Sequence, residues 1–279
     1  MSVSSQPDTL IIEAGRAERH YWRDLWSYRE LFAILAWRDV SVQYKQTVIG
    51  LAWAVVRPAL TMAVFTIIFG RIAKVPTEGG VPYPLLVMAG MLPWFLVSTI
   101  LANGANSLVS NSNLISKVYF PRLIVPFASS LVAVIDFAIN LVLLAAMMIW
   151  YRFVPDWHLL FIPVFVCFGL LAAIGPALIM AALNVNYRDF RFVIPFAIQF
   201  GLYVSPVGFS STIIPEQWRL LYALNPVVAV VDGFRWSLLA GRTHLSIDTL
   251  LLGGCVTALF LYLGIKLFRG TERSFADLI

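Results

Sequence analysis

Charged residues are scarce in this chain of 279 residues, in which only 13% are Asp, Glu, Lys or Arg and 60% are apolar. Soluble domains average about 25% charged and about 45–50% apolar residues. The two cysteines, Cys167 and Cys255, lie inside apolar runs, which is typical of buried inert thiols and not of disulfides. The three histidines, His20, His158 and His244, lack the spacing of metal ligands. This composition predicts a chain that lies mostly in a lipid bilayer.

Two sequence signatures are also missing. There is no glycine-rich loop ending in Gly-Lys-Ser/Thr, the phosphate-binding motif of P-loop NTPases. Residues 1–30 are polar and of mixed charge, without the apolar core of a signal peptide, so we expect the chain to begin in the cytoplasm. The net charge of +5 comes from basic residues at the ends of apolar runs and not from a continuous patch, which argues against a nucleic-acid partner. We therefore predict no catalytic residue, no metal and no cofactor bound by this chain.

Long apolar runs dominate what is present. No charged residue or histidine occurs between Gly79 and Ser116. A membrane-spanning helix needs about 20 apolar residues, and the sequence offers such runs near 51–73, 84–110, 123–151, 159–184, 191–211 and 247–268. Arg57-Pro58 interrupts the first run close to its start, where an arginine can reach the membrane interface. The fold prediction is therefore an all-α integral membrane protein with six transmembrane helices.

The basic residues indicate the orientation of these spans. Six spans place both termini on one side, and lysine and arginine are enriched in cytoplasmic segments. If both termini are cytoplasmic, the inner segments hold most of the 20 basic residues, namely Arg16, Arg19, Arg23, Arg29, Arg38, Lys45, Arg57, Lys117, Arg122, Arg188, Arg191, Lys266, Arg269 and Arg273. The outer segments hold Arg71, Lys74, Arg152, Arg219, Arg235 and Arg242. The bias predicts a multi-pass protein of the cytoplasmic (inner) membrane with both termini in the cytoplasm.

The segment before the first span is amphipathic. Leu31, Phe32, Leu35, Val42 and Ile49 recur on one flank at helical spacing, which predicts a helix lying in the membrane surface. The alternative is an ordinary soluble helix. The predicted parts of the chain are a cytoplasmic N-terminal segment, an amphipathic interface helix, a six-span domain and a cytoplasmic C-terminal tail, over residues 1–27, 28–49, 50–268 and 269–279.

The segment 212–246, between the fifth and sixth spans, is too apolar for a solvated loop and too interrupted for a span. Pro215, Asn225-Pro226 and Gly233 divide it into helical pieces near 216–224 and 227–240. Asn225 followed by proline is a helix start, with asparagine as the cap and proline at the first helical position. Apolar helices of this length are typically re-entrant or interfacial. We predict two short re-entrant helices on the outer side, next to a vestibule or pathway.

Two inner loops combine basic and aromatic residues. The first is Lys117-Val118-Tyr119-Phe120-Pro121-Arg122, and the second is Tyr187-Arg188-Asp189-Phe190-Arg191. Short, proline-stiffened and aromatic turns suit docking to another protein. We expect both loops to receive mechanical work from a partner, although Arg188 and Asp189 would also suit a solvated charge pair.

One carboxylate lies inside a predicted span. Asp136 is in the middle of the third span, with Asn140 one turn further on. A charge at this depth costs about 2.5–3.5 kcal/mol and should face protein or water. Two roles are open, a proton relay and a hydrogen bond that holds a neighbouring helix in register. The lack of an evident basic partner favours the second.

Aromatic residues make up 14% of the chain and recur in or near the first, second and fifth spans. Aromatic faces stack on sugar rings, so these residues are candidates for a glycan path. The same residue types are common on lipid-facing helices and at membrane interfaces. The candidates are Trp53, Phe65, Phe69, Trp94, Phe95, Phe200 and Tyr203.

A family resemblance covers about residues 31–240. The residues that carry it are Leu31-Phe32 through Trp37-Arg38-Asp39, Tyr44-Lys45-Gln46-Thr47, Gly50-Leu51-Ala52-Trp53 leading to Pro58, Gly90, Pro93-Trp94, Asn113-Leu114-Ile115, Lys117 to Arg122, Asn186 to Phe190, Ser205-Pro206-Val207, Asn225-Pro226 and Phe234-Arg235. With these motifs the chain resembles the membrane permeases of type-2 ATP-binding-cassette exporters that move O-antigen, capsule and teichoic-acid precursors.

The resemblance implies partners and roles. Two permease copies would work with two copies of a P-loop ATPase, which binds the ATP and Mg²⁺, and a polyprenyl-diphosphate-linked glycan would pass through a channel at the permease interface. It implies ATPase contacts for Lys117, Val118, Tyr119, Phe120, Pro121, Arg122, Tyr187, Arg188 and Asp189. It also implies an outer gate at Pro215, Trp218, Asn225, Pro226 and Arg235.

Three other functions compete with this one. A gradient-driven secondary transporter usually has internal repeats and paired intramembrane ionisable residues, whereas this sequence has Asp136 and no convincing repeat. A membrane glycan enzyme should carry carboxylate or histidine clusters, which the sequence lacks. A homologous permease exporting a drug or a simple lipid remains the main alternative.

Overall fold

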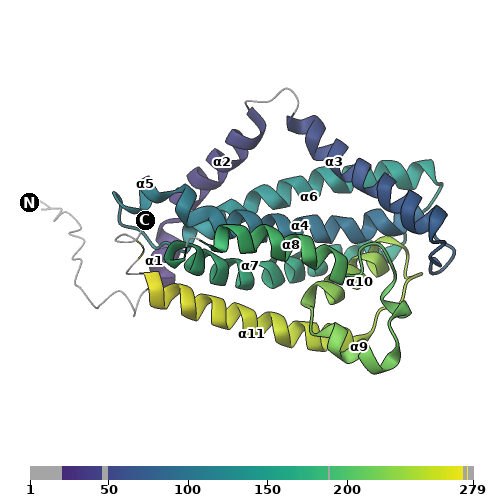
Figure 1. Cartoon of the computed structure of the whole chain (residues 1–279). Helices are drawn as coiled ribbons and strands as arrows, with labels where there is room; N and C mark the ends of the chain where they lie inside the picture. Colours follow the sequence, from purple (N-terminus) through teal and green to yellow (C-terminus); the bar gives the residue numbers. More distant parts are fainter. Residues whose placement is uncertain (1–20, 46–49, 188, 273–274, 276–279) are drawn as a thin grey trace, which may run out of the picture.

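The structure is a computed structural model that describes residues 21–45, 50–187, 189–272 and Phe275, without the side chains of residues 50 and 51. Within these ranges all regular structure is helical (Figure 1). Several predictions fall outside them, namely residues 1–20 of the N-terminal segment with Arg16 and Arg19, residues 46–49 of the interface helix, Arg188, and residues 273–274 and 276–279 of the tail with Arg273.

Among the described residues, five helices are long and apolar enough to cross a membrane. They are Ala52–Ile72, which joins α3 (Gly50–Phe65) to the π-helix η2 (Thr66–Ile72), then α4 (Tyr83–Ser110), α6 (Ile124–Trp150), Trp157–Asn186, which joins the 3-10 helix η3 (Trp157–Phe161) to α7 (Ile162–Asn186), and α11 (Ile247–Thr271). α4, α6, α7 and α11 run alongside one another in a bundle, and α3 crosses it obliquely (Figure 1). The predicted all-α integral membrane architecture is confirmed.

The predicted fifth span is shorter than expected. α8 (Phe190–Val204) has 15 residues and ends well before residue 211. Ser205 is extended, with φ −90° and ψ 151°, because the following Pro206 disfavours the helical conformation at the residue before it. The next helical turn is η4 (Ser211–Ile213). The sequence contained this stop signal, but apolar residues beyond it masked the boundary.

α4 is the central helix of the bundle. It is the most buried of the five candidate spans and packs against α6 on one side and α7 on another. α11 packs along α7, and glycines allow the close approach, since a Cβ atom on Gly264 would lie 2.5 Å from the Gly175 carbonyl oxygen. Small residues at helix crossings are a common means of packing in membranes.

The N-terminal helices lie against this bundle. α1 (Tyr21–Ser27) is followed by α2 (Arg29–Lys45), which packs along α6 and buries Leu35 and Ala36. Ile34, Trp37 and Val42 stay exposed. The predicted apolar flank is therefore only partly covered, because Val42 does not share the burial of Leu35.

Two short helices, α9 (Glu216–Ala223) and α10 (Pro226–Leu238), occupy the predicted re-entrant segments. The Asn225 side-chain oxygen accepts a hydrogen bond from the Val227 N–H at 3.1 Å, with Pro226 in the first turn, as the sequence predicted. α9 is largely exposed, whereas α10 is buried between α4, α7 and α11. Both lie at the end of the bundle opposite α1 and α5 (Ser112–Ile115) (Figure 1).

Candidate functional site

The two predicted docking loops lie at the same end of the bundle, which we call the basic end. The 117–122 loop joins α5 to α6, and the 187–189 loop joins α7 to α8, close to α1 and to the last turn of α11 (Figure 1). Lys117, Arg191 and Lys266 belong to this end. The structure thus brings together two loops that are far apart in the sequence.

The 117–122 loop has an exposed tip and a buried base. Lys117, Val118 and Tyr119 are exposed, and Tyr119 has 62% of its surface accessible. Phe120, only 3% exposed, points into an apolar cluster with Leu123 and Phe268. Only the tip offers side chains to another molecule, while the base fixes where the tip stands.

Arg122 is held by its own chain. Its backbone N–H donates a hydrogen bond to Glu272 Oε1 at 2.8 Å, and its guanidinium donates to the Glu272 backbone oxygen. The guanidinium carbon also lies 6.0 Å from the centre of the Phe275 ring. We predicted ATPase contact for Arg122, and the structure gives it contacts at the C-terminal end of α11.

Glu272 is a site residue that the sequence reasoning missed. Its Oε1 accepts a further hydrogen bond from the Tyr21 hydroxyl at 3.3 Å, and Arg269 lies over the Tyr21 ring at 4.7 Å. Burial raises the pKa of the Glu272 carboxyl, opposed by the hydrogen bonds from Arg122 and Tyr21 and by the charges of Arg122 and Arg269. The sequence feature that could have identified Glu272 is a carboxylate placed just after the last span, among basic residues.

The second loop is more open. Tyr187 and Asp189 are both exposed. The Asp189 carbonyl accepts from the Phe192 N–H at 3.0 Å, so this residue begins α8, and the Tyr187 and Phe190 rings lie 6.3 Å apart. Two exposed side chains therefore stand at a point where α7 and α8 meet.

α2 is attached to the bundle near the first loop. The Arg38 guanidinium donates to the Asn111 side-chain oxygen at 2.6 Å, at the end of α4, and pairs with Asp39 at 2.7 Å. Arg38 and Asp39 belong to the motifs that carried the family resemblance. Movement of α2 would therefore displace the segment where α4 leads into α5 and the 117–122 loop.

Asp136 also faces α2. Its carboxylate accepts hydrogen bonds from the Gln43 amide at 3.3 Å and from the Tyr44 hydroxyl. A carboxylate shared with a neighbouring helix is the arrangement that the register-holding role requires. The contact favours that role over a proton relay.

The predicted outer-gate residues separate into different environments. Arg235 is buried and donates to the backbone oxygens of Leu86 at 3.2 Å, Phe209 at 2.8 Å and Val207 at 2.7 Å. The bonds to Val207 and Phe209 satisfy carbonyls of the irregular segment that follows α8, as buried non-helical backbone requires, whereas Leu86 lies in α4. Asn225 and Pro226 cap α10, and only Pro215 and Trp218 are exposed.

The predicted glycan-path aromatics divide in a similar way. Phe65, Phe69, Trp94 and Phe95 pack in one cluster between α3, η2 and α4. Trp94 is 6% exposed and leaves little surface for a ligand. The exposed members are Trp53 on α3 and Phe200 and Tyr203 on α8.

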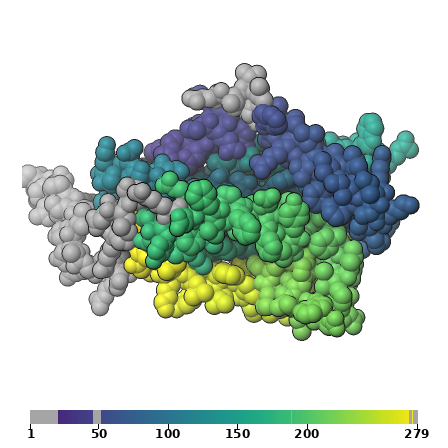
Figure 2. Space-filling model, viewed as in Figure 1, coloured from purple at the N-terminus to yellow at the C-terminus, as the bar shows by residue number. Residues whose placement is uncertain are grey.

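α8 and α3 lie on the same open face of the molecule (Figure 2). The exposed side of α8 is a row of large apolar side chains at helical spacing, and the rings of Phe196 and Phe200 stack with centres 6.1 Å apart. The row consists of Phe192, Phe196, Phe200 and Tyr203. Such a face must be covered by lipid or by another chain.

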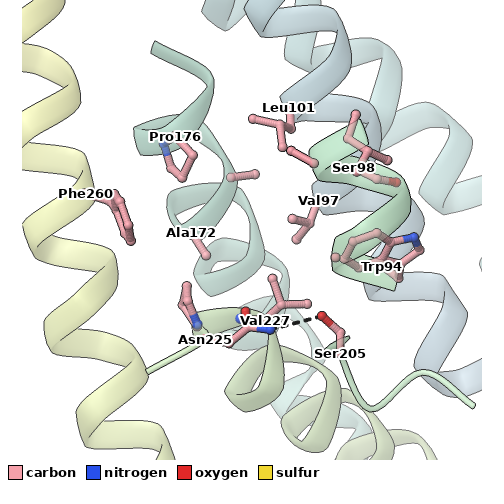
Figure 3. Close-up of a pocket in the computed structure, with 15 residues that line it drawn as sticks. Trp94, Val97, Ser98, Leu101, Ala172, Pro176, Ser205, Asn225, Val227 and Phe260 are labelled. Carbon is pink, nitrogen blue, oxygen red and sulfur yellow. Dashed lines mark hydrogen bonds between the residues drawn. The ribbon is translucent and has the colours of Figure 1, made fainter. Parts of the chain in front are cut away.

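An apolar cavity of about 180 Å³ lies behind α8 (Figure 3). Trp94, Val97 and Ala172 line it, together with Phe260 of α11. Its polar end is the Asn225 amide, which donates to the Ser205 hydroxyl at 3.1 Å. Trp94 is the only predicted path residue among those lining it, so this cavity is not the predicted glycan path.

Residues 30–239 match the model of the ABC-2 type transporter family. This match covers most of the chain, so the chain belongs to the ABC-2 type transporter family. It is a multi-pass membrane protein of that family.

Similar proteins extend over nearly the whole chain. The O-antigen export system permease protein RfbA of Myxococcus xanthus is 27% identical over 260 residues, which cover 92% of this chain and 98% of that protein. RfbA of Klebsiella pneumoniae is 23% identical over 252 residues, covering 90% and 95%. The polysialic acid transport protein KpsM of Escherichia coli is 22% identical over 250 residues, covering 85% and 92%.

Proposed function

We propose that the chain is the channel-forming permease of an ATP-driven exporter that moves a polyprenyl-diphosphate-linked, O-antigen-like polysaccharide across the inner membrane. The observation that carries this proposal is the similarity over nearly full length to permeases whose names state O-antigen and polysialic acid export. The family membership and the exposed loops at the basic end agree with it.

ATP would be hydrolysed by a separate subunit. The sequence has no P-loop motif of its own, and the tips of two loops stand exposed at the end of the bundle where Lys117, Arg191 and Lys266 lie. Lysine and arginine favour the cytoplasmic side, where an ATPase has its nucleotide. Val118, Tyr119 and Tyr187 are the side chains best placed for its two copies to contact.

The path would lie between two copies of the chain. A glycan is polar and needs a water-accessible route, while its lipid anchor is more stable in the bilayer. α8, which carries the exposed row, and α3, whose Trp53 is exposed, lie on one face of the molecule that a second copy could complete. Aromatic rings on such a face would stack on sugar rings and would leave the route accessible to water.

Co-purification and loss of function test the proposal together. The chain, extracted gently from its native membrane, should carry a P-loop ATPase with it, identified by mass spectrometry. Deleting the gene for the chain should make lipid-linked glycan accumulate on the cytoplasmic side. Accumulation of a drug or a simple lipid instead would support the alternative permease, and transport by the purified chain without an ATPase would refute both.

A further inference from the structure

Glu272 joins three parts of the chain that are distant in sequence. Its carboxylate accepts from the Arg122 N–H at 2.8 Å and from the Tyr21 hydroxyl at 3.3 Å, so the 117–122 loop, α1 and α11 meet at one group. We call this meeting point of the 117–122 loop, α1 and α11 the joint. Phe275 belongs to it, because its side chain is fully buried and its ring centre lies 5.2 Å from that of Phe268. The loop base therefore stands on the end of α11.

A carboxylate at this position is unfavourable for the helix itself. Glu272 is the C-cap of α11, and the negative end of a helix dipole disfavours a nearby negative charge. Serine, glycine or lysine would serve the helix end better. The contacts with Arg122 and Tyr21 offset this cost, which indicates that the residue serves the joint and not the helix.

α11 then connects the joint to the opposite end of the bundle. In its C-terminal half it crosses α7 at glycines, where a Cβ on Gly264 would lie 2.5 Å from the Gly175 oxygen. Nearer its start it packs against α9 and α10, and a Cβ on Gly253 would lie 2.9 Å from the Ala229 Cβ of α10. Contacts this close leave little room for α11 to move without moving its neighbours.

We propose that α11 carries displacement of the 117–122 loop to the α9–α10 unit at the opposite end, and that Glu272 is the positioning residue that couples the loop to α11. The inference rests on the proposed function, because it needs a partner that moves the loop. Two sites are coupled only if a change at one alters the other, so the test must read out both ends.

The test uses the complex of the chain with its co-purified ATPase, reconstituted in liposomes. Cys167 and Cys255 are exposed in the structure, so the predicted burial of both thiols is wrong, and both are changed to Ala. The exposed Gln217 on α9 is changed to Cys in this background as a reporter. The rate of labelling by a membrane-impermeant maleimide is measured with and without ATP plus orthovanadate. With Glu272 present, trapping the nucleotide should change the labelling rate.

Matched variants isolate the joint. Glu272→Ala should reduce the nucleotide-dependent change in labelling, and the glycan exported per ATP hydrolysed, about fivefold or more, as is typical of allosteric coupling. Glu272→Gln keeps the acceptor oxygen for Arg122 and Tyr21 and should remain close to wild type. Glu30→Ala, at an exposed acid of α2 outside the proposed route, controls for the loss of a negative charge.

The outcomes separate this inference from the proposed function. An unchanged labelling response in Glu272→Ala, or no response with Glu272 present, overturns the inference while ATPase binding can still hold. Failure of any ATPase to bind the wild-type chain overturns the proposed function itself. Should Glu272→Ala not be recovered, Phe275→Leu weakens the same joint at its aromatic contacts and should reduce the response in the same way; an unchanged response overturns the inference.

Discussion

The two ends of the bundle each use one charged residue to hold irregular backbone, with different results. At the opposite end, Arg235 binds three carbonyl oxygens and leaves the segment after α8 buried. At the basic end, Glu272 binds the base of the 117–122 loop and leaves its tip exposed. The first arrangement fixes a whole segment in place. The second fixes only a base, so that another molecule can still reach the tip.

Removing the anchor of the opposite end should have the largest effect. Arg235→Met leaves the Val207 and Phe209 carbonyls without this donor, and each such loss costs about 1–3 kcal/mol, so we expect about 2–6 kcal/mol of destabilisation. Thermal unfolding in detergent measures it. Arg219→Ala, which removes an exposed arginine of α9, is the control and should change little. Equal stability of the Arg235→Met and Arg219→Ala proteins would contradict the claim that Arg235 holds the segment after α8 in place.

The second largest effects should distinguish the buried base of the 117–122 loop from its exposed tip. Phe120→Ala should destabilise the protein by about 3 kcal/mol, because it empties a buried aromatic position. Tyr119→Ala should change stability by less than about 0.5 kcal/mol, since its side chain is exposed. ATPase assays of the complex should then show hydrolysis without export for Tyr119→Ala. Normal export per ATP in that variant would contradict a docking role for the tip.

A glycine variant tests how closely the Arg235 side chain packs against α4. A Cβ on Gly90 would lie 2.6 Å from an Arg235 guanidinium nitrogen. Gly90→Ala should therefore cost about 1–3 kcal/mol, the usual range for overpacking. The same substitution at Gly254 of α11, where a Cβ meets nothing within 4 Å, should be neutral or stabilising. Melting temperatures of the pair compare the two sites directly.

The smallest effect is expected for a substitution of Asp136, which lies between the two ends of the bundle. Asp136→Asn keeps a side-chain oxygen that can accept from Tyr44, so stability should fall by less than about 1 kcal/mol and export should persist. Export of glycan by cells carrying the variant measures this. A complete loss of export by a folded Asp136→Asn protein would restore the proton-relay alternative.

Much of the fold follows from the sequence because bilayer thickness constrains apolar runs strongly. The runs near 84–110, 123–151 and 247–268 became α4, α6 and α11 within a few residues. Asn225-Pro226 started α10 as predicted, since capping chemistry is local. The end of α8 was predicted too late, because apolar residues continue beyond Ser205-Pro206.

The site was harder to predict than the fold. The two loops were identified, but composition cannot show which way each side chain points. Phe120 and Arg122 looked equivalent to Tyr119, and only packing against α11 sets them apart. Glu272 and the α2 partners of Asp136 were missed because these contacts join residues about 90 to 150 positions apart, which no local pattern records.

The early end of α8 leaves this helix with a hydrophobic mismatch. Its 15 residues make it about 22 Å long, against a hydrocarbon layer of about 30 Å. Where lipid and not a second copy covers α8, it meets a shorter apolar surface than lipid beside α6 or α11, and a bilayer responds to such a surface by thinning. Thinning there would shorten the apolar distance between the two headgroup layers next to α8.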